Sequence, residues 1–250
     1  MLGLNVESVS PGVRAKRGER LPVVLSMPET VALLGAMSGT PRLMAALIYG
    51  GGLRVSECCE LRIKDLDFEA GRISVLGAKG GKDRMVAMPC SVMELLRGQL
   101  EFSRHIWQQD FRNQMPVKLP GNLARKAPDY RFAWPWAWVF PGHQPCRDPR
   151  TGEMVRWRMH EVNVQRAVRQ ARRALGIMVL PHELRHGYAT HALSAGANIK
   201  AVALAMGHTN IETTAGYCHA EACGIRSPLD TLACAENILP MTRAVPAKFA

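Results

Sequence analysis

Two strand-like segments joined by a glycine-rich turn set the limits on how this chain can fold. Apolar and polar residues alternate over Arg72–Leu76 and again over Arg84–Met88, as in half-buried strands. The intervening Gly-Ala-Lys-Gly-Gly-Lys-Asp carries glycines that permit the positive φ values of a hairpin turn. Most of the remaining pattern is helical. We therefore predict a mainly α fold with a small antiparallel β-sheet, of the α+β class.

Capping residues and apolar periodicity indicate where the helices begin and end. Ser26 and Glu29 form a capping box, so we expect the first helix to begin at Ser26. A second helix begins at Thr40-Pro41 and is ended by Gly50-Gly51-Gly52. Further helices are predicted over residues 91–109, 160–175, 181–195, 199–206 and 210–219.

Both ends of the chain and one internal stretch depart from this pattern. Residues 1–25 hold turn formers and basic residues, and we interpret them as a linker or N-terminal arm. Residues 26–235 form the predicted main domain, and residues 115–145, rich in proline and tryptophan, interrupt it as an insertion. We expect residues 236–250 to form a flexible C-terminal tail.

The charge of the chain favours a polyanionic partner. Its formal net charge is +11, and each phosphate that a basic protein neutralises releases a counterion. No apolar run is long enough to cross a bilayer, and residues 1–19 lack the apolar core of a signal peptide. The cysteines number seven, and Cys58 and Cys59 are adjacent, so we expect reduced thiols in a cytoplasmic protein with no membrane partner.

The segment His182-Glu183-Leu184-Arg185-His186 matches the zinc-protease pattern H-E-x-x-H. On a helix, His182 and His186 share one face and could bind a metal ion. However, Arg185 would place a permanent cation beside that ion, and the metzincin extension of glycine and histidine is missing. We expect no metal and no cofactor, and a zinc hydrolase stays a rival interpretation.

The same helix also suits phosphate chemistry. His182 and Arg185 lie three residues apart, on one face and near a helix N-terminus, where free N–H groups attract phosphate. Residues of the same kind occur elsewhere in the chain, namely Arg54, the turn lysines Lys79 and Lys82, His208 and Tyr217.

Two arginines, two histidines, a lysine and a tyrosine suit the metal-free transesterification of a phosphodiester. Two guanidiniums can neutralise the non-bridging oxygens of the transition state. A tyrosine has an ordinary pKa of about 10 and needs help as a nucleophile, which a histidine can give. A lysine can protonate the leaving 5′-oxygen. A phosphotyrosine link keeps the energy of the phosphodiester, which agrees with the lack of a G-x-x-x-x-G-K-[ST] phosphate loop.

Four motifs resemble those of the tyrosine recombinase (phage integrase) family, and they occur in the family's order. They are Tyr49–Glu57, Lys79–Arg84, Pro181–His186 and the stretch from Gly207 to His219. The resemblance implies the tyrosine recombinase catalytic-domain fold and site-specific DNA recombination through a 3′-phosphotyrosine intermediate.

The resemblance also implies a role for each residue. Arg54 and Arg185 would bind the scissile phosphate, and Tyr217 would be the nucleophile. The two histidines of the site would be His182 and His208. The general acid would be Lys79, with Lys82 in the same turn as the alternative.

Within the family, the chain is most similar to the integron integrases, which integrate and excise gene cassettes. The similarity rests on the insertion around Leu119–Phe140 and on the run Gly224–Asp230. It implies that the insertion helps to bind folded single-stranded sites and holds their flipped-out bases. The DNA-binding residues expected on this basis and from the hairpin are Lys82, Arg84, Trp134, Trp136, Trp138 and His143.

One departure from the family leaves alternatives open. These recombinases usually carry a helical clamp domain before the catalytic one, whereas here only about 25 residues precede Ser26. A truncated DNA-binding remnant without recombination activity is therefore a rival to the recombinase. A type IB topoisomerase is a further rival because it shares the chemistry but relaxes supercoils without needing a partner site. Ala205-Met206 replaces the more usual Leu-Leu at packing positions.

The expected partners are DNA, double-stranded or folded single-stranded, and other recombinase protomers, docked through residues 222–235.

Overall fold

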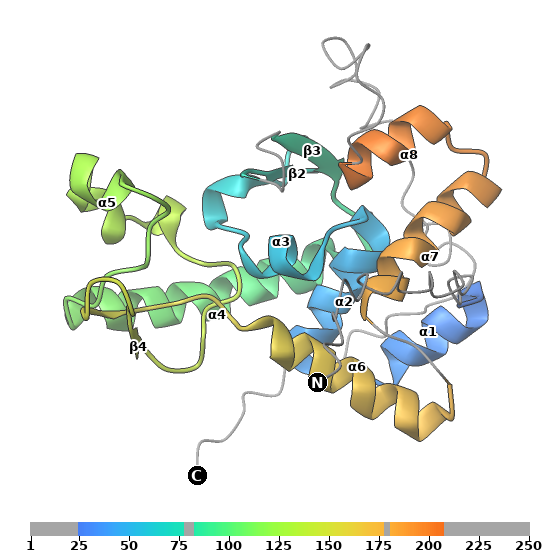
Figure 1. The fold of residues 1–250 in the computed structure, drawn as a ribbon, viewed down its shortest axis with the longest axis horizontal. Helices are drawn as coiled ribbons and strands as arrows, with labels where there is room; N and C mark the ends of the chain where they lie inside the picture. Colours follow the sequence, from blue (N-terminus) through green and yellow to red (C-terminus); the bar gives the residue numbers. More distant parts are fainter. Residues whose placement is uncertain (1–24, 78–82, 178–180, 208–250) are drawn as a thin grey trace, which may run out of the picture.

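A computed structural model describes residues 25–77, 83–177 and 181–207 and shows the mainly helical architecture with small antiparallel sheets that the sequence predicts (Figure 1). The predicted helix at 210–219 and four predicted site residues, Lys79, Lys82, His208 and Tyr217, lie outside the described residues. The α-helices are α1 (Met27–Gly35), α2 (Gly39–Gly51), α3 (Val55–Cys59), α4 (Met93–Arg112), α5 (Leu123–Lys126), α6 (Glu161–Leu175), α7 (Pro181–Ser194) and α8 (Ile199–Met206). The strands are β1 (Leu66–Asp67), β2 (Arg72–Val75), β3 (Arg84–Ala87), β4 (Cys146–Arg147) and β5 (Met154–Val155). Short 3₁₀ helices lie at Ile63–Asp65, Cys90–Val92, Pro128–Arg131 and Trp134–Trp136.

Helix α2 forms the centre of the hydrophobic core because it is apolar on every side. All of its residues from Leu43 to Gly51 are buried, and α1, α3, α4, α6 and α7 contact it. A helix of this kind is stable only when neighbours cover it all round. It ends at Gly52, whose left-handed backbone (φ +65°) suits glycine. The path of the chain into Arg54 is therefore fixed by the most buried helix of the fold.

The predicted helix ends agree with the structure to within about three residues, as expected for capping signals. The Ser26–Glu29 capping box forms, with the Ser26 N–H donating to the Glu29 carboxylate at 2.8 Å. Helix α6 begins one residue later than predicted, because the ring of His160 caps it by accepting a hydrogen bond from the Val162 N–H at 3.2 Å. Helix α4 begins at Met93 because a 3₁₀ turn over Cys90–Val92 precedes it.

The predicted hairpin forms as β2 and β3, and β1 adds a third antiparallel strand in the order β1-β2-β3. Ile73 pairs with Val86 and Val75 pairs with Arg84, and all four side chains are buried. The sequence did not reveal β1, because a strand of two residues is too short to show alternation. Arg84 thus carries a charge into the buried face of the sheet, where it needs an oppositely charged partner.

Residues 113–158 form a side lobe on the C-terminal half of α4 (Figure 1). The lobe contains the predicted insertion at 115–145 and continues through the β4–β5 hairpin. A two-pronged ion pair anchors it, with Nε and Nη2 of Arg156 at 2.7 and 2.6 Å from the carboxylate oxygens of Asp110. Both residues are buried, so the lobe is held to α4 by a charged contact as well as by apolar packing.

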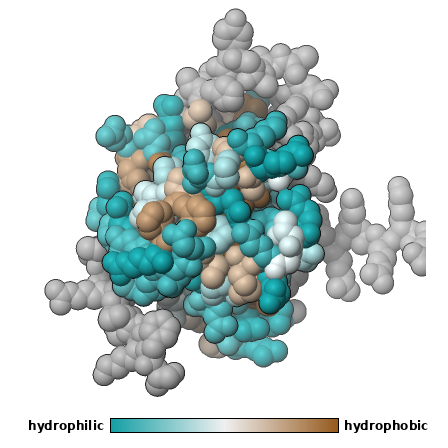
Figure 2. All heavy atoms as spheres, turned by 90° about the vertical axis from the view of Figure 1, so that its left-hand side faces the viewer, coloured by the Kyte–Doolittle hydropathy of each residue, from teal (hydrophilic) through white to brown (hydrophobic). Residues whose placement is uncertain are grey.

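The outer end of the side lobe is mainly hydrophilic, with a few apolar side chains gathered on it (Figure 2). Phe111, Tyr130 and Met154 are the large apolar residues exposed on the lobe and the adjoining end of α4.

Within the described residues, no helix combines the length and the apolar content needed to span a bilayer. Cys58, Cys59 and Cys146 are free thiols, as the prediction of reduced cysteines requires for them.

We predict that Gly52→Ala destabilises the fold far more than Gly176→Ala. Both glycines end a helix with nearly the same φ, +65° and +67°. A Cβ at Gly52 would lie 2.6 Å from two ring carbons of Tyr188, whereas one at Gly176 would meet no atom within 4 Å. We expect losses in the free energy of unfolding of about 3 kcal/mol or more and of about 1 kcal/mol, respectively, by urea denaturation. Equal losses would show that backbone strain alone matters at Gly52.

Candidate active site

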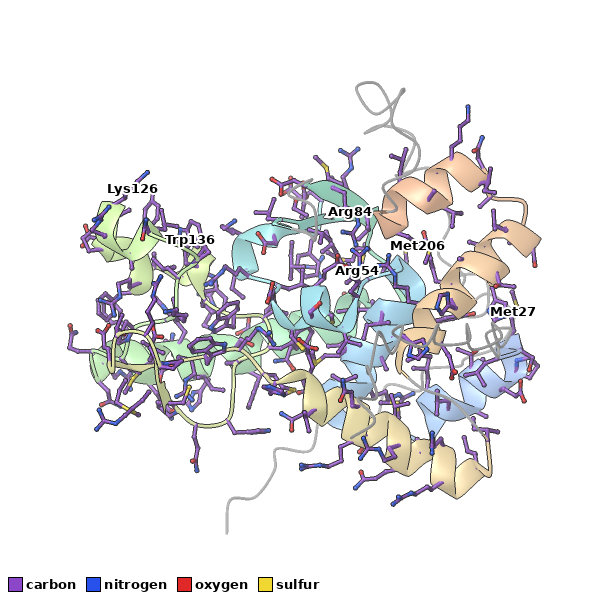
Figure 3. The ribbon with its side chains drawn as sticks, viewed as in Figure 1. Met27, Arg54, Arg84, Lys126, Trp136 and Met206 are labelled. Atoms are coloured by element: carbon purple, nitrogen blue, oxygen red, sulfur yellow. The ribbon has the colours of Figure 1, made fainter. Side chains whose placement is uncertain are left out.

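Three arginines from separate segments of the chain converge on the buried carboxylate of Glu57. Two of them, Arg54 and Arg84, are labelled in Figure 3. Arg54 Nη1 lies 2.5 Å from Oε1. Arg84 binds both oxygens, with Nη1 2.9 Å from Oε1 and Nη2 2.6 Å from Oε2. Arg185 Nη1 lies further away, 3.6 Å from Oε2. Three guanidiniums against one carboxylate leave an excess of positive charge, which suits an anionic substrate.

Local structure explains how Arg54 and Glu57 come together. Arg54 directly precedes α3, and Glu57 lies in the first turn of that helix. The Glu57 carboxylate accepts a hydrogen bond from the Arg54 backbone N–H at 2.7 Å. A carboxylate in the first turn also interacts favourably with the positive end of the helix dipole. The start of α3 therefore brings Arg54 and Glu57 together without any contribution from the distant residues Arg84 and Arg185.

The charges of the cluster depend on one another. Burial raises the pKa of Glu57, but hydrogen bonds from Arg84 and Arg54 and the charge of Arg84 outweigh it and lower the pKa to about 2. Burial, together with repulsion by Arg54 and Arg84 that the Glu57 charge partly offsets, lowers the pKa of Arg185 to about 10. With these pKa values, Glu57 and Arg185 are both charged at neutral pH.

The C-terminal end of α8 supplies further partners for the arginines. Arg84 Nε donates to the Ala205 carbonyl at 2.7 Å, Arg185 Nη2 donates to the Met206 carbonyl, and Arg54 Nη2 donates to the Gly207 carbonyl at 3.4 Å. The last carbonyls of a helix lack intrahelical donors and carry the negative end of its dipole. The arginines thus anchor the end of α8 at the residue that precedes His208.

Arg185 also binds the other end of the site. Its Nη1 donates to the Gly52 carbonyl at 2.7 Å, and its side chain is 10% exposed. Arg54 is the more open of the two predicted phosphate-binding arginines, with 29% of its side chain exposed. The structure therefore brings together these two predicted residues, which lie in separate motifs of the sequence.

His182 lies in the first turn of α7, one turn before Arg185, and is exposed. Its ring contacts that of His186 edge-on, with the centroids 5.8 Å apart. Within residues 25–77, 83–177 and 181–207, no three His, Cys, Asp or Glu residues form a group that could hold a metal ion. This part of the chain therefore gives the H-E-x-x-H motif no third ligand.

Two of the predicted DNA-binding tryptophans are engaged in packing. Trp138 is 6% exposed, its Nε1 donates to the Arg156 carbonyl at 3.1 Å, and the guanidinium of Arg62 lies 3.7 Å from its ring centroid. Trp134 packs against Trp107 with ring centroids 5.5 Å apart. These contacts hold the side lobe together.

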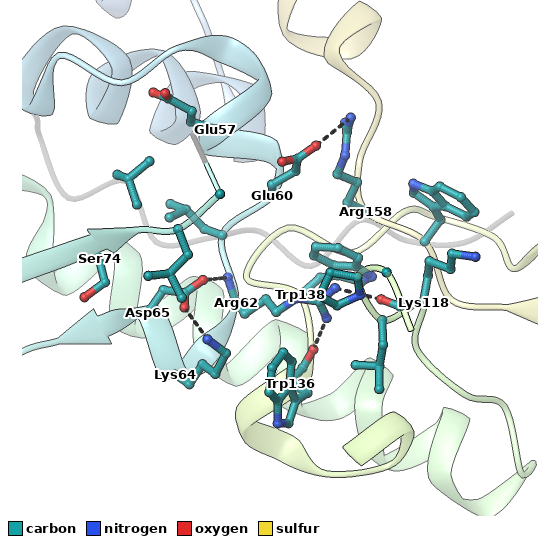
Figure 4. Close-up of a pocket in the computed structure, with 18 of the residues that line it drawn as sticks. Glu57, Glu60, Arg62, Lys64, Asp65, Ser74, Lys118, Trp136, Trp138 and Arg158 are labelled. Carbon is teal, nitrogen blue, oxygen red and sulfur yellow. Dashed lines mark hydrogen bonds and ion pairs between the residues drawn. The ribbon is translucent and has the colours of Figure 1, made fainter. Parts of the chain in front are cut away.

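Trp136 lines a cleft of about 670 Å³ between α3, β2 and the side lobe (Figure 4). Its ring stacks on Tyr130 with centroids 5.4 Å apart, and Lys64 Nζ lies 4.6 Å from the ring centroid. Glu57 also lines the cleft, so the cleft reaches the arginine cluster. Its basic and aromatic lining residues are Arg62, Lys64, Lys118, Arg150, Arg158, Trp136, Trp138 and Trp157.

The remaining predicted DNA-binding residues that the structure describes lie elsewhere. His143 is exposed and lines a separate cavity of about 290 Å³ with Thr40 and Arg166. The guanidinium of Arg84 is buried against Glu57. The structure thus groups Trp136 with Trp138, and neither with His143.

Sequence reasoning gave no role to Glu57, although it lies inside a motif that was singled out. The signal was the spacing of Arg54 and Glu57, since an acidic residue three positions after an arginine can pair with it on a helix. Glu57 was also in the first turn of an unrecognised helix. Arg62, which binds the carbonyls of Trp136 and Lys118, gave no such signal because its partners are backbone atoms.

The comparison with known families gives a match over most of the chain. The sequence model described as the phage integrase family matches residues 24–222. An integrase/recombinase of Escherichia coli is 43% identical over 225 residues, which cover 88% of this chain and 67% of that protein. The tyrosine recombinase XerC of Halalkalibacterium halodurans is 33% identical over 207 residues, which cover 80% of this chain and 59% of that protein.

A solved structure shares the fold. It is that of the XerH site-specific recombinase bound to a palindromic difH substrate in a post-cleavage complex, with a TM-score of 0.52 and 23% sequence identity. The match covers 84% of this chain and 53% of that chain. The chain thus spans between about half and two thirds of the length of these proteins.

We predict that Glu57→Gln lowers stability in a pH-dependent way. The pKa of Glu57 falls from 4.5 to about 2 on folding, so its ionised form stabilises the fold above pH 4.5, and this contribution is lost as the pH falls to about 2. The difference in free energy of unfolding between wild type and variant should shrink by about 3 kcal/mol over that range. Urea denaturation at several pH values measures it.

The control for this prediction is Glu94→Gln, which removes an exposed carboxylate paired with Arg97. Its effect should be small and nearly independent of pH. A Glu57→Gln difference that stayed constant with pH would contradict the charged cluster.

Proposed function

The chain belongs to the phage integrase family, and from this premise we propose that it cuts and rejoins DNA as a tyrosine-type site-specific recombinase. The observation that carries the proposal is the convergence of Arg54 and Arg185 on one charged cluster. Two guanidiniums from separate motifs are what a phosphodiester needs for binding without a metal ion. The relative solved with difH substrate supports DNA as the partner.

Arg54 and Arg185 would bind the two non-bridging oxygens of the scissile phosphate. Nη1 of Arg54 stays bound to Glu57 at 2.5 Å, whereas its Nη2 is suited to turn toward the phosphate, because its bond to the Gly207 carbonyl is long at 3.4 Å and the side chain is partly exposed. Arg185 is suited to stay, because the carbonyls of Gly52 and Met206 hold it in a buried position. One arginine would thus adapt to the phosphate while the other provides a fixed reference.

The reaction would be a transesterification at phosphorus. The Tyr217 oxygen attacks the phosphorus atom and passes its proton to a histidine, His208 or His182. The bond between phosphorus and the 5′-oxygen breaks, and Lys79, or alternatively Lys82, protonates the leaving oxygen. A 5′-hydroxyl of another strand then attacks the 3′-phosphotyrosine and releases the tyrosine. The phosphotyrosine link keeps the energy of the phosphodiester, so no ATP is needed, and the two guanidiniums take the place of a metal ion at the phosphate oxygens.

We predict that the chain forms a covalent complex with a nicked DNA substrate that loses its 5′-hydroxyl fragment after cleavage. Tyr217→Phe should abolish this complex, while the matched variant Tyr130→Phe, which keeps its stacking on Trp136, should retain it. Denaturing electrophoresis with labelled DNA detects the covalent species. Addition of a chelator should leave the yield unchanged, because the arginines bind the phosphate.

Three results would count against the proposal. DNA binding without any covalent complex would favour the inactive remnant. A requirement for zinc would revive the hydrolase. Relaxation of supercoiled DNA without a partner site would favour the type IB topoisomerase.

We further propose that the chain acts on integron-type sites formed by folded single strands, in the cytoplasm and together with other protomers. The support is the cleft beside Trp136, which combines aromatic rings with the basic groups of Arg62 and Lys64. Aromatic rings stack on unpaired bases, and cations bind the adjoining phosphates. Residues 222–235, which lie outside the described residues, would dock on a neighbouring protomer.

We predict that Trp136→Ala weakens binding to a folded single strand with unpaired bases by about 5- to 100-fold. Binding to a fully paired duplex should change little, because a duplex offers no free base to the cleft. The control is Trp134→Ala, which removes a ring packed against Trp107 instead. Fluorescence anisotropy at one salt concentration measures both affinities. Equal losses on the two DNAs, or equal losses in the two variants, would contradict stacking at Trp136.

A further inference from the structure

Arg84 differs from Arg54 and Arg185 because its guanidinium binds both oxygens of Glu57 at hydrogen-bond length. All three of its nitrogens donate hydrogen bonds, to the two oxygens of Glu57 and to the Ala205 carbonyl, at 2.6 to 2.9 Å. Its side chain is 8% exposed. Such a two-pronged contact with a buried carboxylate is strong and fixes the geometry of both partners.

The surroundings of Arg84 leave it little room to move. A Cβ at Gly207 would lie 3.1 Å from its Nη1, and Gly207 has φ +64°, so glycine is the residue that suits this position. Arg84 begins β3 and pairs with Val75 of β2, so its backbone is also held by the sheet. An arginine held on all sides in this way is poorly placed to reach DNA.

The distances from the Glu57 carboxylate to Arg84 and to Arg185 differ, and the difference indicates how Arg84 affects the position of Arg185. Arg84 occupies both carboxylate oxygens at hydrogen-bond length, whereas Arg185 stays 3.6 Å away from Oε2. Arg54 already donates Nη1 to Oε1 at 2.5 Å, so without Arg84 the carboxylate would attract Arg185 as well, because a buried charge must be compensated. Nη1 of Arg185 would then turn from the Gly52 carbonyl to Glu57.

We propose that Arg84 is a positioning residue for the phosphate-binding arginines. It binds both oxygens of Glu57, so that Arg185 keeps its place on the Gly52 and Met206 carbonyls and Arg54 gives Glu57 only Nη1 of its side chain before DNA binds. This inference rests on the proposed recombinase function, and it replaces the expectation that Arg84 contacts DNA. The site is thereby prepared in advance, which is how fixed charges stabilise a transition state most effectively.

The first test separates positioning from DNA contact in Arg84→Gln. We expect the rate of covalent complex formation at saturating DNA to fall by roughly 100-fold, as for a misplaced catalytic group. The dissociation constant for DNA should stay within about twofold, with an unchanged salt dependence. Weaker binding with a smaller salt slope and a normal rate at saturation would show a DNA contact and overturn the proposal.

The second test uses a DNA substrate with a methylphosphonate at the scissile position. This group lacks one anionic oxygen, so its cleavage depends less on the arginines. The rate deficit of Arg84→Gln should therefore shrink by about tenfold or more, relative to the deficit on the phosphodiester. A deficit of the same size on both substrates would overturn the proposal.

A matched control is Arg156→Gln, which breaks another buried two-pronged pair, with Asp110 in the side lobe. It should lower stability to a similar degree, but any rate deficit should be equal on the two substrates. Arg84→Lys should not restore the rate, because an ammonium group presents its donors from a single nitrogen and cannot match the planar guanidinium that reaches both Glu57 oxygens and the Ala205 carbonyl. Full rescue by lysine would show that charge alone matters.

The pH dependence gives a readout independent of rates on modified DNA. Without Arg84, burial still raises the pKa of Glu57 while its strongest hydrogen bonds are lost. The pKa should rise, so the activity of Arg84→Gln should fall toward acidic pH more steeply than that of the wild type. A wild type that forms no covalent complex would contradict the proposed recombinase function itself. An active wild type whose pH profile runs parallel to that of Arg84→Gln would overturn the positioning role of Arg84.

Discussion

The carboxylate of Glu57 lies where the start of α3, the start of β3 and helices α7 and α8 meet, and three guanidiniums compensate its charge. Neither sign of charge would be stable there alone, because a buried ion without a partner costs several kcal/mol. Bringing Arg54, Arg84 and Arg185 together therefore requires an anion among them. The cluster keeps a positive excess toward the outside, and that excess is what a phosphate would meet.

Helix α2 sets the frame in which this cluster forms. It packs against α7, and the hydroxyl of Tyr49 lies 2.8 Å from Nδ1 of His191, which joins the two helices in the core. The carbonyl of Gly52, directly after α2, accepts a hydrogen bond from Arg185 of α7. The most buried helix and the helix that carries His182 and Arg185 are thus locked together, and the site inherits the rigidity of the core.

Sequence patterns predicted the parts of this structure that are encoded locally. The Ser26 cap, the glycine end of α2 and the β2–β3 hairpin each depend on residues close to one another in the chain. Helix α3 and strand β1 were missed because five and two residues are too few to show a period. The local pair of Arg54 and Glu57 had a signal in its spacing, whereas the contacts of Glu57 with Arg84 and Arg185 had none, because those partners lie far away in sequence. The inward course of Arg84 was missed for the same reason and because one of its partners is a backbone carbonyl.

The contacts at the end of α8 concern carbonyl oxygens, which every amino acid provides. Ala205 and Met206 are 1% and 2% exposed, which agrees with their expected role in packing. The hydrogen bonds from Arg84 and Arg185 go to their backbone carbonyls and not to their side chains. Natural variation at these two positions can therefore proceed under the single demand of filling the space. The side chains at positions 205 and 206 can thus differ between related sequences while the hydrogen bonds from the arginines to the backbone stay the same. Such a contact leaves no trace in the sequence and is visible only in a three-dimensional structure.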